Sequence, residues 1–233
     1  MAADPAAVAV AVCGVQAQDL ASGMLSLRVR GTDMTLHTTS AAFARGSLVR
    51  TWLMRGTLHL VAADDARWLL TVLGPLNARR DTTRRARLGL DDASCDRMIS
   101  AIRTALSDGP LTRLQLREHL EGKGMTVRQG QAMSHLRGLA ASRGVLTLTE
   151  QRGRFNTFSL LDDVVPSERR RLSVERAEAE LARRYLVAYA PATVRDFAVW
   201  SGVPMALARR AMSAIASDVI GMEGPLPGLL RLK

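Results

Sequence analysis

Two glutamines two positions apart, Gln16 and Gln18, are the residues of this chain whose type and spacing most suggest chemistry. They follow a short apolar stretch that ends at Gly14. Side chains of an extended segment alternate with a period of two, so both amides would project to the same side, whereas on a helix they would point to nearly opposite sides. An amide carbonyl accepts a hydrogen bond and its NH₂ donates, so a pair on one side of a linker could orient water or a polar ligand.

The same pair has a simpler interpretation, in which the linker satisfies exposed backbone groups at a helix end. Asp19, which follows directly, is an alternative general base, although its position fits the N-cap of the next helix better. The residues alone leave these alternatives open.

The charge of the chain points to a polyanionic partner. The 233 residues carry a net charge of +10, and Lys123 and Lys233 are the only lysines, so nearly all the positive charge is arginine. A bias of the coding sequence explains arginine in place of lysine, but it does not explain so large an excess over acidic residues. Because guanidinium groups match the geometry of phosphates and release counterions on binding, we expect a nucleic-acid partner.

Composition excludes several other classes of protein. No apolar run approaches the ~20 residues that cross a bilayer, and the apolar start lacks the basic region of a secretory signal. Cys13 and Cys95 are isolated, and the four histidines show no ligand spacing. We therefore expect no metal, no organic cofactor and no membrane association, and a cytoplasmic location.

Two helix starts repeat along the chain. Pro110, Thr112 and Gln115 in GPLTRLQLREHL align with equivalents in APATVRDFAVWSGV, where Thr193 and Asp196 follow Pro191. The threonines are predicted N-caps, and Gln115 completes a capping box. Each start is followed by a second helical stretch and then by two short β-like runs. Helix, turn, helix and hairpin is the order of a winged helix-turn-helix.

A third unit of this kind is predicted at the N-terminus, where LVRTWLM and TLHLV turn around Arg55 and Gly56. The fold class is therefore mainly α with small β-hairpins, in tandem winged helix-turn-helix repeats. We expect a first unit over residues 1–62, a connecting helix and basic segment over 63–90, a second unit over 91–165, and a third, incomplete unit over 166–233.

Three stretches resemble the AlkZ/YcaQ-like DNA glycosylases, a family built from tandem winged helices. CGVQAQ is similar to the family's Gln-x-Gln motif, LVRTWLMRGTLHLV to its signature hairpin, and PATVRDFAVWSGV to the start of its third winged helix. Relative to that family we expect the chain to be shortened at both ends, without the helical segment that usually precedes the first helix and without a C-terminal β-rich region.

The resemblance implies a DNA glycosylase that hydrolyses the N-glycosidic bond of N-alkylated, including crosslinked, bases in DNA repair, with Gln16 and Gln18 as catalytic residues. It also implies a damaged double-stranded DNA partner, association with the nucleoid and a monomer. The alternative is a non-catalytic winged-helix DNA-binding protein or transcriptional regulator, whose recognition helix would read the major groove.

Several basic and polar side chains are candidate DNA contacts in either case. Arg50 and Arg55 flank the hairpin, His59 alternates with apolar residues on its second strand, and Arg84 and Arg85 belong to the basic segment. Arg128 and Gln131 lie on the predicted recognition helix of the second unit. The full set of expected DNA-binding residues is Arg50, Arg55, His59, Arg84, Arg85, Arg128 and Gln131.

Overall fold

The computed structural model describes residues 4–125, 131–153, 155–166, 172–222 and 228–233. Helices dominate, and the strands are short and antiparallel. None of the helices in these ranges combines the length and the apolar character that a bilayer crossing requires.

The first unit begins with a short helix that ends just before the glutamine linker. Its elements are α1 (Pro5–Ala11), β1 (Val15–Gln16), α2 (Leu20–Arg28), α3 (Leu36–Ala44), β2 (Leu48–Trp52), a 3₁₀ turn η1 (Met54–Gly56) and β3 (Leu58–Ala62). Asp19 caps α2, accepting hydrogen bonds from the backbone N–H and the hydroxyl of Ser22, which lower the pKa of its carboxyl. A carboxyl held in this way is a weaker base. Asp19 is therefore the helix cap that its position in the sequence predicted, and not a general base.

Helices α4 (Ala63–Arg80) and α5 (Thr82–Arg87) connect the first unit to the second. The second unit has α6 (Asp92–Leu106), β4 (Leu111–Thr112), α7 (Arg113–Gly122), α8 (Ala132–Ser142), β5 (Leu146–Arg152) and β6 (Phe155–Leu160), followed by the single turn α9 (Leu161–Val164). The third has α10 (Val174–Tyr189), α11 (Val194–Ser201), α12 (Met205–Ser213), the 3₁₀ turn η2 (Ala216–Asp218), β7 (Val219–Met222) and β8 (Leu229–Leu232).

One order of elements therefore occurs three times: a helix, an extended segment, two helices and a hairpin. In the third unit the extended segment is a bridge between Ala192 and Leu230. Both predicted N-caps are present, because Thr112 and Thr193 form capping boxes with Gln115 and Asp196. Each box satisfies backbone donors that would otherwise be unpaired at the helix start.

The hairpins of the first two units join edge to edge. Arg50 of β2 pairs with Leu148 of β5, which produces a six-stranded sheet in the order β1-β3-β2-β5-β6-β4. The hydroxyl of Thr147 reinforces the junction by donating to the carbonyl of Arg50 at 3.0 Å. The third unit keeps a separate two-stranded sheet of β7 and β8.

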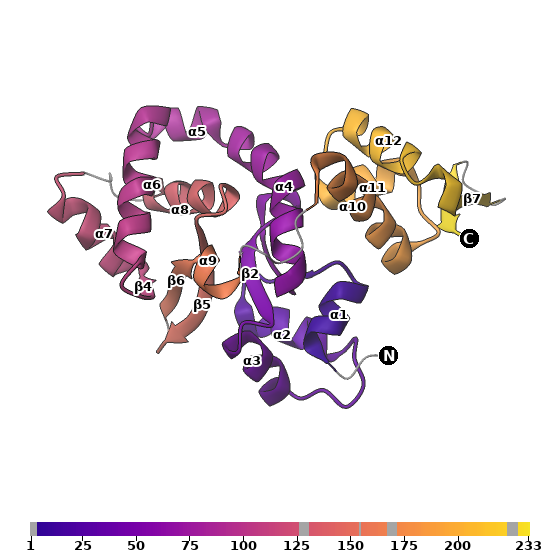
Figure 1. Cartoon of the computed structure of the whole chain (residues 1–233), viewed down its shortest axis with the longest axis horizontal. Helices are drawn as coiled ribbons and strands as arrows, with labels where there is room; N and C mark the ends of the chain where they lie inside the picture. Colours follow the sequence, from indigo (N-terminus) through magenta and orange to yellow (C-terminus); the bar gives the residue numbers. More distant parts are fainter. Residues whose placement is uncertain (1–3, 126–130, 154, 167–171, 223–227) are drawn as a thin grey trace.

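Helix α4 lies at the centre, with the first unit below it, the second to its left and the third to its right in Figure 1. Its fully buried Trp68 shares one core with Leu181 of α10 and Phe197 of α11. The indole N–H of Trp68 donates to the buried Asp65 at 2.7 Å, and Arg184 of α10 pairs with the same carboxylate at 3.2 Å. Charged and apolar contacts thus fix the third unit against α4.

On its other side α4 approaches α8 so closely that one position must be glycine. A Cβ placed on Gly74 would lie 2.3 Å from the backbone oxygen of Ser142. We expect Gly74→Ala to force the two helices apart and to lower the free energy of unfolding by about 1–3 kcal/mol, measured by urea denaturation. Gly122→Ala is the control, because a Cβ at Gly122 meets no atom within 4 Å; equal effects of the two changes would contradict this packing.

Candidate active site on the glutamine linker

The linker is extended, which is the conformation in which two residues at this spacing share one side. Val15 and Gln16 form β1 and pair with Leu60 and His59 of β3. Val15 and Ala17 are buried, whereas Gln16 and Gln18 are exposed. Both amides therefore project from the same side of the linker, at the edge of the six-stranded sheet.

Two glycines permit this course of the chain. Gly14 has a φ of +88°, and a Cβ there would lie 2.6 Å from a methyl of Val61. A Cβ on Gly23 of α2 would lie 2.6 Å from the Cβ of Ala17. The linker is consequently held between β3 on one side and α2 on the other, with no room for a larger residue at either contact.

Protein donors orient both glutamine carbonyls. The Oε1 atom of Gln18 accepts from the backbone N–H of Leu58 at 2.7 Å. The Oε1 atom of Gln16 accepts from Arg55 Nη2 at 3.5 Å. Each carbonyl oxygen has a second lone pair, so it can still accept from water or face a developing positive charge.

The guanidinium of Arg50 holds the backbone of the linker in place. Its Nε donates to the carbonyl of Ala17 and its Nη2 to that of Gln18, both at 2.8 Å, while Nη1 donates to Asn156 Oδ1 at 3.1 Å. Arg50 is only 2% exposed. We expected a phosphate contact at this position; the geometry instead favours a residue that positions the glutamine backbone.

His59 lies directly opposite Gln16 across β1 and β3, with Thr51 of β2 on its other side. Its Nδ1 is 2.9 Å from the carbonyl of Thr57, which can only accept, so Nδ1 carries the proton. Burial lowers the pKa of the imidazole to about 4. His59 is 3% exposed, so it supports the Gln16 side of the sheet rather than presenting a broad surface to DNA.

Arg55 connects Gln16 to the third unit. Its Nη1 donates to the carbonyl of Trp200, and its backbone has a left-handed φ of 56°. A Cβ on Gly202 would lie 3.0 Å from the Cα of Arg55. A left-handed backbone at a non-glycine residue is costly, and such strain is concentrated at functional sites.

The third unit also contacts the chain just before the linker. The hydroxyl of Tyr189 donates to the carbonyl of Val12 at 3.2 Å, and Arg184 Nη1 donates to that of Val10 at 3.0 Å. Residues from α10 and α11 therefore contact both the approach to the linker and the arginine beside Gln16.

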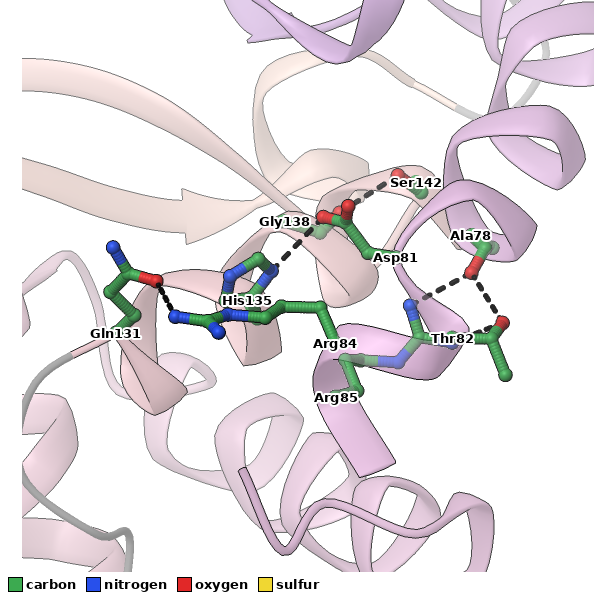
Figure 2. A network of polar contacts seen from close by, with 9 residues as sticks. All are labelled: Ala78, Asp81, Thr82, Arg84, Arg85, Gln131, His135, Gly138 and Ser142. Carbon is green, nitrogen blue, oxygen red and sulfur yellow. Dashed lines mark hydrogen bonds and ion pairs between the residues drawn. The ribbon is translucent and has the colours of Figure 1, made fainter. Parts of the chain in front are cut away.

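A second group of the expected DNA contacts meets where α5 faces α8 (Figure 2). The exposed Arg84 donates from Nη2 to Gln131 Oε1 at 2.7 Å. Arg85 is buried and turns back, donating to the Ala78 carbonyl at 2.8 Å and to the Thr82 hydroxyl at 3.3 Å. It braces the junction of α4 and α5, while Arg128 lies outside the described residues.

The packing of α8 differs from that of a free recognition helix. Its residues Met133, Leu136 and Leu139 are buried, and Ser142 abuts Gly74 of α4. Most of the helix is therefore covered by protein, and Gln131 at its N-terminal end is exposed. This arrangement leaves little of the helix for reading base edges in a groove.

Several site residues were not found from the sequence. Asn156 and Trp200 reach the linker region from 106 and 145 positions away from their partners. Asn156 stands in no recognisable motif, and Trp200 lies in the stretch PATVRDFAVWSGV, which gives no sign of a contact with the first unit. Gly23 carried a usable signal, because a glycine inside a helix is unfavourable unless it permits close packing.

The arrangement can orient water and a polar substrate through two uncharged amides, with the exposed Arg55 beside Gln16 to bind an anion. Throughout the described ranges, no three His, Cys, Asp or Glu side chains gather closely enough to hold a metal ion. Fold and site together define a helical protein of three like units that presents a glutamine pair at a sheet edge.

Comparison with known proteins identifies the family of the chain. A family model described as DNA glycosylase AlkZ-like matches residues 10–226, and the chain belongs to that family. An interstrand DNA cross-link repair glycosylase of Streptomyces sahachiroi is 28% identical over 195 residues, which is 81% of this chain and 52% of the relative.

The fold agrees with a solved structure as well. The structure of the Streptomyces sahachiroi DNA glycosylase AlkZ superimposes with a TM-score of 0.85 at 22% identity, over 100% of this chain and 65% of that one. At this identity the likeness establishes the fold. The chain spans between about half and two thirds of the length of these relatives.

The geometry beneath the linker predicts that Arg50→Lys loosens the glutamines. A single ammonium cannot replace the planar fork that reaches three acceptors. We expect a loss of about 1–3 kcal/mol of folding stability and faster hydrogen exchange at the Ala17 amide, which donates to the Leu58 carbonyl. Arg45→Lys, at an exposed position, serves as the control. Unchanged exchange in Arg50→Lys would show that Arg50 does not hold the linker.

The low pKa of His59 predicts a loss of stability in acid. The unfolded chain protonates this imidazole near its usual pKa of 6.5, whereas the folded chain does so only near 4. The stability contributed by the neutral, buried ring is therefore complete above pH 6.5 and falls as the pH drops toward 4. His59→Asn lacks this titration, so wild type should lose about 2 kcal/mol more than the variant between pH 7 and pH 4.5, measured by urea denaturation. Parallel curves for the two proteins would refute the assignment.

Proposed function

We propose that the chain is a DNA glycosylase, which hydrolyses the N-glycosidic bond of N-alkylated bases in double-stranded DNA, including bases that crosslink the two strands. The observation that carries this proposal is the pair of exposed amides at Gln16 and Gln18, presented on one side of a fixed linker. Family membership supports it, as does the similarity to the Streptomyces sahachiroi interstrand DNA cross-link repair glycosylase.

Two uncharged amides suit a substrate that is already activated. A base alkylated on a ring nitrogen is cationic, so its bond to C1′ breaks with the electron pair moving to the base, which leaves neutral. The sugar develops oxocarbenium character, and water adds through its oxygen to C1′ while a proton passes to solvent. The glutamine carbonyls can accept from that water and face the cationic sugar, and their NH₂ groups can bond phosphate or deoxyribose.

One order of elements occurs three times along the chain, and this repetition supports our further proposal that the three units are tandem winged helices. Because one chain supplies all three, we also propose a monomer that acts on damaged duplex DNA in the nucleoid. The net charge of +10 supports such a partner. The covered α8 helix favours recognition of a lesion over recognition of a sequence, since weakened stacking at damage can supply selectivity.

The first experiment is release of 7-methylguanine from duplex DNA by wild type and by Gln16→Ala, Gln18→Ala and the double variant. We expect single-turnover release to fall by about 10²-fold or more in each, because the amides position water and stabilise developing charge. DNA affinity should stay within a few-fold of wild type, and thermal melting should confirm folding. The same assay with an interstrand crosslink tests the wider substrate range.

A folded chain that binds duplex DNA but releases neither base would overturn the enzymatic proposal. Equal release by wild type and the double variant would instead remove the chemistry from the glutamine pair. Gln115→Ala, remote on α7, controls for the loss of a glutamine amide; it should weaken only the cap of that helix.

A further inference from the structure

A cleft of about 260 Å³ lies where the C-terminal end of α4, the start of α5, helix α8 and the η1 turn meet. We call it the α4–α8 cleft. Its walls include Trp52, Arg55, Asn77, Arg80, Asp81 and His135. Figure 2 shows the Asp81 and His135 side of this region, with Gly138 beside them on α8. None of the candidate catalytic residues lines it.

The charge of the cleft is positive. Arg55, Arg80 and Arg85 contribute three guanidinium groups to its lining. The one acidic residue there, Asp81, is 3.0 Å from His135 Nδ1 and so already has a partner. Arg85 is 4% exposed, and its Nε has no hydrogen-bond partner in the part of the chain that the structure describes. An anion is the ligand that this lining stabilises.

The absence of a side chain at Gly138 keeps the cleft open, and no close contact between helices requires glycine at this position. Gly138 lies inside α8, where glycine costs about 1 kcal/mol relative to alanine. At Gly74 and Gly23 a close neighbour explains the missing side chain, but a Cβ on Gly138 would meet nothing nearer than Trp52 Nε1 at 4.0 Å. The space that a side chain would fill belongs to the cleft.

The cleft adjoins the glutamine linker through Arg55. This residue lines the cleft and also donates to Gln16 Oε1. The neighbouring Gly56 has a φ of +73°, and a Cβ there would lie 3.4 Å from Arg80 Nη1 and 3.5 Å from Asn77 Oδ1. A ligand in the cleft would therefore lie next to Gly56, which has no side chain to exclude it. Arg55 would separate this ligand from Gln16.

We propose that the α4–α8 cleft binds a backbone phosphodiester of the DNA, beside the nucleotide whose base is released at Gln16 and Gln18. The assignment rests on the proposed function. Arg80 and Arg55 would donate to the phosphate oxygens, while Trp52 and Gly138 leave space for the attached sugar. An extruded N-alkylated base is a poorer occupant, because its positive charge would face three guanidinium groups.

The test compares Arg80→Gln with Arg79→Gln, an exposed arginine one position earlier that does not line the cleft. Binding is measured on a duplex with one stable abasic-site analogue, which fixes the register, over a range of salt concentrations. We expect Arg80→Gln to raise Kd about tenfold and to reduce the salt slope by about 0.9, the value for one phosphate contact. Arg79→Gln should change both much less.

Methylphosphonate substitution locates the contact. Neutralising single phosphates in turn should weaken wild-type binding sharply at one or two positions beside the analogue. In Arg80→Gln the same substitutions should cost clearly less than in wild type, because the two changes remove one shared interaction and only the contact with Arg55 is left to lose. An unchanged positional profile in Arg80→Gln would overturn the proposal.

Gly138 provides a test that leaves every arginine in place. Gly138→Ala should raise the melting temperature, because alanine is favoured inside a helix, and Gly138→Leu should fill the cleft. We expect Gly138→Leu to bind the duplex about tenfold more weakly and to lose the same methylphosphonate profile, while remaining folded. Wild-type affinity in a folded Gly138→Leu variant would show that DNA does not enter the cleft.

These results separate the cleft from the chemistry. Loss of the phosphate contact in Arg80→Gln would support the proposed phosphate site in the cleft. If the glutamine variants then release the base as well as wild type does, the catalytic assignment of Gln16 and Gln18 is refuted. Normal DNA binding by Arg80→Gln and Gly138→Leu, together with loss of base release in the glutamine variants, would refute the phosphate site and support the catalytic assignment.

Discussion

The hydrogen bonds of one buried guanidinium set the geometry of the candidate active site. Arg50 donates to two consecutive carbonyls of the glutamine linker and to Asn156 of the second hairpin. A linker has no helical or sheet partner for all of its backbone groups, so its course depends on such donors. Because the same side chain reaches both units, the direction of the glutamine amides and the joining of the two hairpins are parts of one arrangement.

The central helix α4 adds the third unit to that arrangement. Its Asp65 pairs with Arg184, which also donates to the carbonyl of Val10. Trp200 accepts from Arg55, which in turn contacts Gln16. Although only two glutamines are assigned to the chemistry, residues from all three units hold the linker and its neighbours. Proteins that place a site on a short segment need such support from rigid elements.

Local patterns in the sequence predicted local structure well. The Thr-x-x-Gln and Thr-x-x-Asp patterns predicted the caps of α7 and α11. These features depend on residues within a few positions of one another. The hairpin turning at Arg55 and Gly56 belongs to the same group, as does the cap at Asp19.

Contacts between distant residues were not predictable in this way. Burial of Arg50 and Arg85 contradicts what an arginine-rich, basic chain suggests, since each satisfies carbonyls brought to it by the fold. The covering of α8 by α4 likewise brings together residues far apart in the sequence, as in the close approach of Gly74 to Ser142. Winged-helix analogy places that helix in a DNA groove, and nothing within its own sequence indicates a protein partner.

The pairing of β2 with β5 has a consequence for how such a chain can change over evolution. Separating the first two units would expose two strand edges, and open edges invite pairing with other chains. Those units are thus constrained to be inherited together, since neither could be exchanged alone without a new way to protect its edge. The strands of the third unit form a separate two-stranded sheet, so substitution there is limited by the side chains that touch α4 and the linker. Variation among related proteins should accordingly concentrate in the third unit, away from those contacts.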